Sequence, residues 1–210
     1  MISGVRADAF VEGHDIAGRL EIRKAVMRDI PLILELINDY AAKGIMLSRT
    51  EFEMSEAIRD FTVVTQGPAL LGCGALHFYS PTVAEIRSLA VAEHAKTRGV
   101  GRKLVSALIS EAQLFELDAV FAFTYVEQFF QKVGFQVVER GTLPLKVWKD
   151  CLRCPKFQAC DEIAVLRVLR PGRWNESQSP IWGQTRGADD LIQLPIPLGM
   201  PPIVQSIPSK

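Results

Sequence analysis

The segment from Ser88 to Leu104 constrains this chain more than any other. An apolar run ending at Val91 leads into a basic turn with Gly99 and Gly101, and the turn opens directly into an amphipathic helical pattern. Glycines let a backbone approach a ligand closely, and the N–H groups of a first helical turn attract anions. The succession of strand, basic glycine turn and helix therefore predicts a site for a pyrophosphate or a similar anion.

The charge of this turn contrasts with that of the whole chain. Lys and Arg together number 24, as do Asp and Glu, so the formal net charge is zero. The turn matches neither the P-loop nor the dinucleotide G-x-G-x-x-G pattern. The alternative to an anion-binding site is a helix N-terminus that is only solvated and follows a flexible turn. The cations around the turn are Lys96, Arg98, Arg102 and Lys103.

Composition excludes several functional classes. The neutral charge balance lacks the basic footprint of a nucleic-acid-binding protein. No apolar run approaches the roughly 18 to 20 residues that span a bilayer. The N-terminal stretch carries Asp8, Glu12 and Asp15 and lacks the apolar core of a signal peptide. We therefore expect a cytoplasmic protein with no nucleic-acid or membrane partner.

The 210 residues suffice for one domain. We expect that domain over residues 20–170, after a loose leader over residues 1–19. Seven of the twelve prolines lie in residues 171–210. Such a segment buries too little apolar surface to offset its ordering entropy, so we expect a disordered or loosely draped tail there.

Apolar periodicity and turn signals predict an α+β domain. After a short strand over residues 20–25, a first helix follows an N-cap at Asp29, and a Ser48-x-x-Glu51 capping box is expected to open a second helix. Three strands then form an antiparallel meander. The expected later elements are strands over 62–65, 69–78 and 83–91, a helix over about 99–117, a strand over 119–124, a helix over 127–133, and strands over 135–139 and 162–169.

Residues 96–101, Lys-Thr-Arg-Gly-Val-Gly, resemble the acyl-CoA signature of the GCN5-related N-acetyltransferases (GNAT), Gln/Arg-x-x-Gly-x-Gly/Ala, with Lys96 at the first position. The expected element order resembles that fold too, over about residues 20–170. The resemblance implies a mixed central sheet flanked by helices, and acetyl-CoA as co-substrate. The residues implied to bind acetyl-CoA are Leu89, Ala90, Val91, Lys96, Arg98, Gly99, Val100, Gly101 and Arg102.

Residues 47–49, 84–91 and 143–157 are similar to the short, single-domain N-acetylglutamate synthases. This resemblance implies direct transfer of an acetyl group from acetyl-CoA to the α-amino group of L-glutamate in a ternary complex, the entry step of arginine biosynthesis. Acetylation of another small amine or of a protein N-terminus stays open. A non-catalytic acyl-CoA-binding sensor is the alternative from a different functional class.

The reaction needs a general base and a proton donor for the leaving thiolate. By the resemblance, Glu85 is the candidate base; the alternative is an exposed strand carboxylate paired with Arg87. Phe130 stands where a proton-donating Tyr often sits in this family. Tyr125, at the end of the next strand, is therefore the candidate acid, with a reference pKa of about 10. A tyrosine that only packs at a strand end is the alternative for this residue.

Glutamate carries two carboxylates, so its site should hold at least two cations, preferably arginines in bidentate geometry. Arg49 precedes the second helix, in the loop that faces the substrate in this fold. Arg87 lies beside Glu85, and Ser88 is expected to contact the substrate as well. For each cation a surface charge is the alternative. The late segment offers Lys146, Lys149 and Lys156, of which Lys146 fits the resemblance best.

The pattern Cys151-x2-Cys154-x5-Cys160 could supply three ligands of a structural zinc or part of an iron–sulfur set. A fourth ligand would have to come from Cys73, a histidine or Asp161. Since no such partner is evident in the sequence, we expect thiols that pack a connection, and no metal. The expected partners are acetyl-CoA and L-glutamate, and a homo-oligomer stays open.

Overall fold

The structure is a computed structural model of the chain, and it describes residues 18–143, 156 and 159–177. The chain divides into two units, residues 1–174 and 175–210, and the fold below is that of the first unit. Nearly all of the predicted leader and residues 178–210 of the predicted tail lie outside the described residues. The expected domain boundaries therefore stay predictions.

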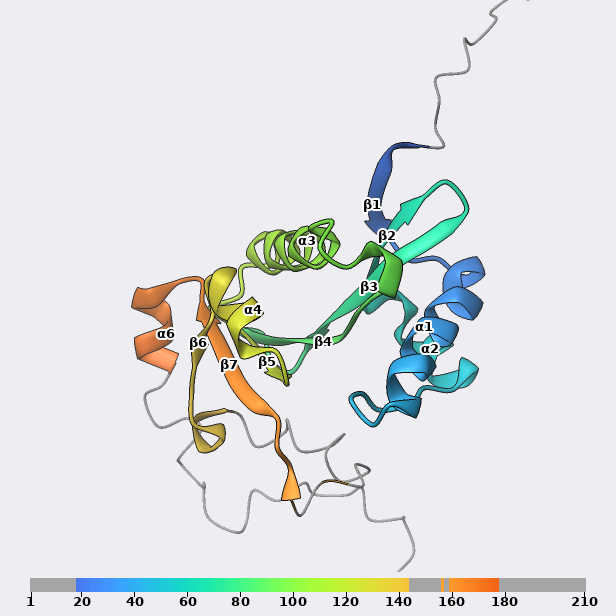
Figure 1. Cartoon of the computed structure of the whole chain (residues 1–210). Helices are drawn as coiled ribbons and strands as arrows, with labels where there is room; N and C mark the ends of the chain where they lie inside the picture. The colour runs from blue at the N-terminus through green and yellow to red at the C-terminus, as the bar shows by residue number, and fades with distance from the viewer. Residues whose placement is uncertain (1–17, 144–155, 157–158, 178–210) are drawn as a thin grey trace, which may run out of the picture. The chain divides into compact units, whose positions relative to one another are not determined.

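A seven-stranded mixed sheet forms the centre of this unit (Figure 1). The first four strands are antiparallel neighbours, which confirms the predicted meander. The fourth and fifth strands are parallel, and the last two strands of the sheet continue antiparallel. In sheet order the strands are β1 (Leu20–Lys24), β2 (Phe61–Gln66), β3 (Ala69–Phe78), β4 (Val83–Val91), β5 (Ala119–Thr124), β7 (Ile163–Val168) and β6 (Gln136–Val137).

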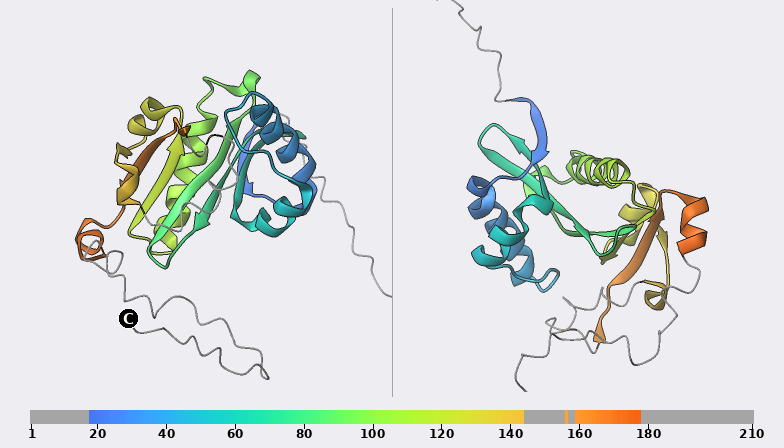
Figure 2. Two further views of the ribbon diagram at one scale, coloured as in Figure 1. Left: turned by 90° about the horizontal axis from the view of Figure 1, so that it is seen from below. Right: turned by 180° about the vertical axis from the view of Figure 1, so that it is seen from behind.

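Helices cover both faces of the sheet, which confirms the predicted α+β class (Figure 2). The helices α3 (Val100–Leu114) and α4 (Glu127–Lys132) pack on one face. The helices α1 (Ile30–Ala42) and α2 (Glu51–Ala57) pack on the other. The short helices are η2 (Met27–Asp29), η3 (Ile58–Asp60), η4 (Glu93–Ala95), η5 (Arg140–Thr142) and α6 (Pro171–Ser177), the last at the start of the predicted tail.

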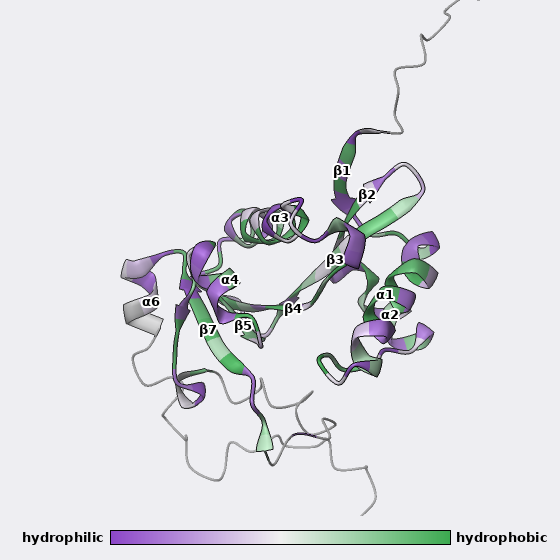
Figure 3. Cartoon of the chain, viewed as in Figure 1, coloured by the Kyte–Doolittle hydropathy of each residue, from purple (hydrophilic) through white to green (hydrophobic). Residues whose placement is uncertain are grey.

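The core consists of apolar side chains between the sheet and these two helix layers. In Figure 3, β7 is coloured mostly as apolar, whereas α3 carries polar residues among apolar ones. Complete burial of one large apolar side chain stabilises a fold by about 1.5–3 kcal/mol, so this double layer supports the rigid sheet on which a site can be built. Fully buried large side chains include Phe61, Phe121, Ile33, Met54, Leu76 and Leu104.

Of the two expectations about helix starts, one was wrong and one is confirmed. The capping box of α2 is Thr50-x-x-Glu53 and not Ser48-x-x-Glu51: the threonine hydroxyl accepts from the glutamate N–H at 3.3 Å, and the carboxylate accepts from the threonine N–H at 2.9 Å. Asp29 is the N-cap residue of α1, as predicted, although its side chain makes no capping hydrogen bond. Its carboxylate binds the Arg23 guanidinium and the Val26 N–H.

Two irregularities of β4 determine where a site can form. The strands β4 and β5 pair over three residue pairs only, the last being Glu85 with Phe121, and beyond this pair they diverge. On its other edge, β4 carries an extra residue against β3, and Ser88 in this bulge has a φ of 51°. Bulges re-aim strand side chains, and a positive φ is uncommon for a residue other than glycine. The sheet thus opens beside a strained segment of β4.

Candidate active site

A cavity of about 850 Å³ lies where β4 and β5 diverge. Its walls come from the connection between α1 and α2, from residues 85–89 of β4, from the end of β5, and from residues close to the start of β7. Small-molecule sites usually have volumes of about 300–1,000 Å³. The cavity is therefore the candidate substrate site.

Glu85 lines this cavity at the last residue pair before the strands diverge. It is only 9% exposed, and its Oε2 accepts a hydrogen bond of 3.0 Å from the Tyr79 hydroxyl. The alternative of an exposed strand carboxylate is therefore wrong. A buried carboxylate that faces a cavity is a suitable general base for an amine.

Two arginines line the same cavity, and the protein restrains both. Asn38 of α1 fixes the backbone of Arg49, since its amide donates to the Arg49 carbonyl at 3.1 Å and accepts from the Arg49 N–H at 3.0 Å. The Arg87 guanidinium lies 4.0 Å from the Asp60 carboxylate, which also contacts His77 Nδ1 at 2.9 Å. The cavity thus has two arginines for an anionic substrate, one with its backbone fixed by Asn38 and one with its guanidinium near Asp60. Ser88 lies on the same wall.

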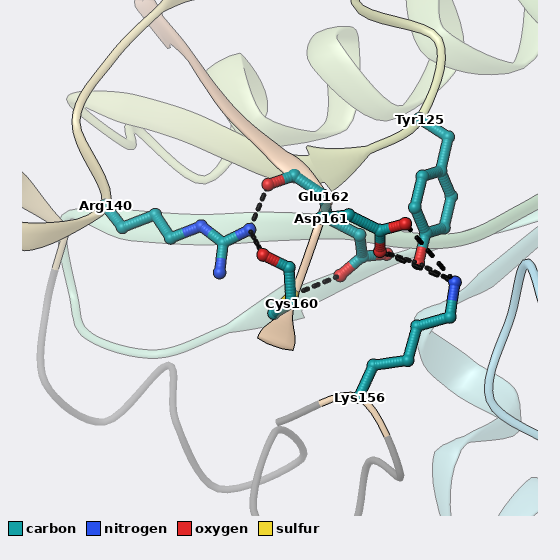
Figure 4. A network of polar contacts seen from close by, with 6 residues as sticks. All are labelled: Tyr125, Arg140, Lys156, Cys160, Asp161 and Glu162. Atoms are coloured by element: carbon teal, nitrogen blue, oxygen red, sulfur yellow. Dashed lines mark hydrogen bonds and ion pairs between the residues drawn. The ribbon is translucent and has the colours of Figure 1, made fainter. Parts of the chain in front are cut away.

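Tyr125 lies on the opposite wall, at the end of β5, within a network of polar side chains (Figure 4). Its hydroxyl donates to Asp161 Oδ1 at 2.9 Å and accepts from Lys156 Nζ at 3.1 Å. Burial raises the pKa of the Tyr125 hydroxyl, and the hydrogen bond from Lys156 acts in the opposite direction. With its raised pKa the phenol keeps its proton at neutral pH, as a proton donor must.

Lys146 and Lys149 lie outside the described residues, so the role predicted for Lys146 stays a prediction. Lys156, the third lysine of the late segment, lines the cavity. Sequence reasoning missed Arg140, which donates to the carbonyl oxygens of Cys160 and Glu162 and so holds this segment against the cavity (Figure 4). It also missed Tyr79 and Glu162, two further lining residues. No local pattern marks these three side chains, because they meet only in the folded chain.

Burial raises the pKa of the Glu162 carboxyl above its usual value, while the charge of Arg140 lowers it. Glu162 Oε2 lies 3.9 Å from Cys160 Sγ, and both residues line the cavity. The other two cysteines of the motif, Cys151 and Cys154, are outside the part of the chain that the structure describes, so the metal alternative stays untested. Burial raises the pKa of the Cys73 thiol to about 12, which disfavours the thiolate that a metal ligand needs.

The predicted anion-binding turn has the backbone that its glycines suggest. Gly99 is the N-cap of α3 with a φ of 76°, a conformation that side chains other than glycine rarely adopt. A Cβ atom on Gly101 would lie 3.3 Å from the Phe129 ring, so this glycine allows close packing. Because α3 begins here, its positive dipole end faces the turn.

The basic side chains of the turn differ in their surroundings. Lys96 forms an ion pair of 2.7 Å with Glu93, and Arg98 donates to Gln66 Oε1 at 3.0 Å. Arg102 is exposed on the first turn of α3, whereas the Val100 side chain is buried in the core. At Val100 only the backbone is therefore available to a ligand.

The other residues predicted to bind acetyl-CoA are at the end of β4. Leu89 lines the cavity, and Ala90 is buried. The Val91 carbonyl accepts a hydrogen bond of 2.7 Å from the Tyr40 hydroxyl, which ties α1 to this strand end. A ligand bound along β4 would thus contact a strand end that α1 holds in place.

An opened mixed sheet, a glycine turn at a helix N-terminus and a cavity lined by a buried carboxylate are together typical of enzymes that move an acyl group from coenzyme A to an amine. Residues 33–135 match the family model described as the acetyltransferase (GNAT) family. An uncharacterised N-acetyltransferase of Chlorobaculum tepidum is 41% identical over 150 residues, which cover 70% of this chain and 96% of that protein. The chain belongs to the GNAT family and is an acetyltransferase, as its resemblance predicts.

One relative in sequence and one solved structure are similar to this chain and carry more specific names. An amino-acid acetyltransferase of Mycobacterium tuberculosis is 32% identical over 136 residues, covering 63% of this chain and 77% of the relative. The structure of N-acetylglutamate synthase from Neisseria gonorrhoeae, complexed with coenzyme A and N-acetyl-glutamate, superposes with a TM-score of 0.66 at 28% identity. That match covers 73% of this chain but only 36% of the Neisseria enzyme.

A Mycobacterium tuberculosis protein solved in complex with CoA matches with a TM-score of 0.62 and 28% identity over 71% of this chain and 99% of that protein. Coenzyme A in these neighbours is consistent with acetyl-CoA as co-substrate. Among the helices of the described ranges, none has the length and apolar character needed to cross a membrane.

Proposed function

We propose that this acetyltransferase transfers the acetyl group of acetyl-CoA to the α-amino group of L-glutamate, the reaction that opens arginine biosynthesis. The observation that carries the proposal is that the buried carboxylate of Glu85 and the two arginines Arg49 and Arg87 line one cavity. Glutamate offers one amine and two carboxylates, and guanidinium groups bind carboxylates in bidentate geometry. Relatives named amino-acid acetyltransferase and N-acetylglutamate synthase support this substrate class.

In the proposed reaction, Glu85 takes a proton from the substrate ammonium group and the free amine attacks the thioester carbonyl. A nitrogen–carbon bond forms, the carbon–sulfur bond breaks, and the CoA thiolate leaves. The nitrogen releases its second proton to water, and water returns a proton to the group that protonates the thiolate. The backbone of β4 from Leu89 to Val91, beyond its pairing with β5, supports the thioester. Glu85 lines the cavity at the last residue pair before β4 and β5 diverge, so a substrate amine bound there can reach its carboxylate.

Tyr125 is the proposed proton donor to the thiolate. Its hydroxyl donates to Asp161 in the structure, so it must turn from that carboxylate toward the sulfur. Lys156 then stabilises the phenolate that forms, because its ammonium group already donates to the same oxygen. The backbone of the turn from Gly99 to Gly101, with exposed Arg102, is the proposed site of the CoA pyrophosphate.

The test is release of CoA from acetyl-CoA, followed by thiol detection, with each of the twenty amino acids separately. We expect turnover with L-glutamate and much weaker turnover with L-glutamine, which has the same length but no side-chain charge. Turnover with a different amine only would keep the reaction and discard glutamate. Binding of acetyl-CoA without release for any amino acid would contradict the proposal and favour a sensor or a protein N-terminus as acceptor.

A further inference from the structure

We propose that Tyr79 is a positioning residue: its hydroxyl orients the Glu85 carboxylate and keeps it ionised to accept the proton of the substrate amine. The inference deepens the proposed function and rests on Glu85 as the general base. The hydroxyl lies 3.0 Å from Glu85 Oε2, within hydrogen-bond distance of a buried carboxylate.

The fold holds the Tyr79 ring in place from several sides. Its N–H donates to the Val83 carbonyl at 3.0 Å, which closes the connection from β3 to β4. The ring contacts His77 edge-on, with centroids 5.0 Å apart, and meets Phe121 at 5.6 Å. Phe121 is fully buried and is also the β5 partner of Glu85. The position of the hydroxyl is therefore determined by the same strand pairing that places Glu85.

This arrangement has a direct chemical consequence. A carboxylate removed from water is unfavourable unless it accepts hydrogen bonds. A donor that binds the charged form favours that form. Without the Tyr79 hydroxyl, Glu85 takes up a proton at a higher pH and its Oε2 loses one directional restraint. Both changes reduce the fraction of enzyme that is ready to deprotonate an amine.

Other charged and titratable groups also face this region. His77 is the cross-strand partner of Glu85, and Arg87 follows two residues along β4, next to Asp60. Because these groups are the same in the wild type and in a Tyr79 variant, they do not account for a difference between the two. The further titratable groups that line the cavity are Tyr40, Arg49, Tyr125, Arg140, Lys156, Cys160 and Glu162.

The test is Tyr79→Phe, which removes one oxygen and keeps the ring contacts with His77 and Phe121. We expect kcat to fall about tenfold, as for loss of a hydrogen bond to a charged group. The acid limb of the pH profile should move to higher pH, while KM for acetyl-CoA stays the same. The matched control is Tyr40→Phe, whose hydroxyl binds the Val91 carbonyl; it should leave the acid limb in place. An unchanged kcat and acid limb in Tyr79→Phe would overturn the proposal.

Two further measurements separate this inference from the proposed function. In a Glu85→Gln background, Tyr79→Phe should lower the remaining activity no further, and an equal loss in both backgrounds would overturn the positioning role. An NMR titration of the Glu85 carboxyl carbon tests the hydrogen bond without any turnover. The midpoint of the titration should lie at higher pH in Tyr79→Phe than in the wild type. Identical midpoints would overturn the inference. Full activity of Glu85→Gln would instead refute Glu85 as the base.

If Tyr79→Phe does not fold, Glu85→Asp provides the test without altering Tyr79. The shorter side chain draws the carboxylate away from the hydroxyl and keeps its charge. The reference pKa of Asp, about 3.9, is lower than that of Glu, about 4.3. Loss of the hydrogen bond should offset this difference, and an acid limb that moves to lower pH by the full difference would overturn the proposal.

Discussion

The two walls of the cavity contain similar polar groups in different surroundings. On the β4 wall, Glu85 is 9% exposed and the Arg87 side chain 14% exposed. On the wall formed by β5 and the start of β7, Tyr125 is 37% exposed and the Lys156 side chain 43%. Polar interactions become stronger as water is excluded, whereas exposed ion pairs contribute little interaction free energy. We therefore expect substitutions on the β4 wall to reduce activity strongly, and substitutions on the other wall to change activity only slightly.

The largest expected effect is that of Glu85→Gln on the buried wall. We expect kcat for L-glutamate to fall by at least about 100-fold, because the amide cannot accept the amine proton. CoA release under saturating acetyl-CoA measures it. The matched control on the opposite wall is Glu162→Gln, for which we expect a smaller loss. A larger loss for Glu162→Gln than for Glu85→Gln would assign the general base to the wall of β5 and β7.

Arg49→Ala is expected to have the second largest effect, and to weaken the binding of L-glutamate. A hydrogen bond to a charged group contributes about 1.5–3 kcal/mol, so KM for L-glutamate should rise roughly 10- to 100-fold while KM for acetyl-CoA stays unchanged. Arg49→Lys should restore part of the loss, since the ammonium group keeps the charge but not the bidentate geometry. Equal changes in both KM values would show that Arg49 supports the fold of the cavity instead of contacting the substrate.

Tyr125→Phe tests the more exposed wall, and we expect kcat to fall only about tenfold, because water can replace an exposed hydroxyl as proton donor. Burial raises the pKa of Tyr125, so the wild-type enzyme should keep its activity through neutral pH and lose it as the pH rises through that raised value. This alkaline loss should disappear in Tyr125→Phe. A full pH profile of kcat measures it, and an alkaline limb that persists would assign the proton donor to another group.

Lys156→Met is expected to have the smallest effect. The ammonium group donates to the Tyr125 hydroxyl and holds the pKa of that tyrosine lower than burial alone would. Its removal should therefore move the alkaline limb to higher pH, with a change in kcat of less than about fivefold. The difference from the wild type should diminish with added salt. Lys132→Met, an exposed lysine on α4, is the matched control and should behave as the wild type.

Much of the fold follows from local sequence patterns. The strand over residues 119–124 and the meander that precedes it are observed as predicted. Gly99 takes the left-handed conformation that the glycine turn suggests. The capping box of α2 was misplaced because Ser48-x-x-Glu51 and Thr50-x-x-Glu53 carry the same signal, and only the chain direction at Thr50 distinguishes them.

The candidate site was predicted less completely, since its members come from distant segments. Tyr125 and Lys156 are 31 positions apart and lie together only because the segment before β7 returns to the end of β5. Arg140 and the carbonyl of Cys160 are 20 positions apart and meet in the same way.

The sequence by itself determined the amphipathic helix α3, the glycine turn before it, and the resemblance to an acyl-CoA family. These features depend on neighbours within a few residues, so local chemistry is enough to specify them. Tertiary structure alone decided that Glu85 is buried, that Tyr79 donates to it, and that Asp60 contacts Arg87. These contacts depend on strand register and on the divergence of β4 from β5, which arise only when the whole sheet assembles.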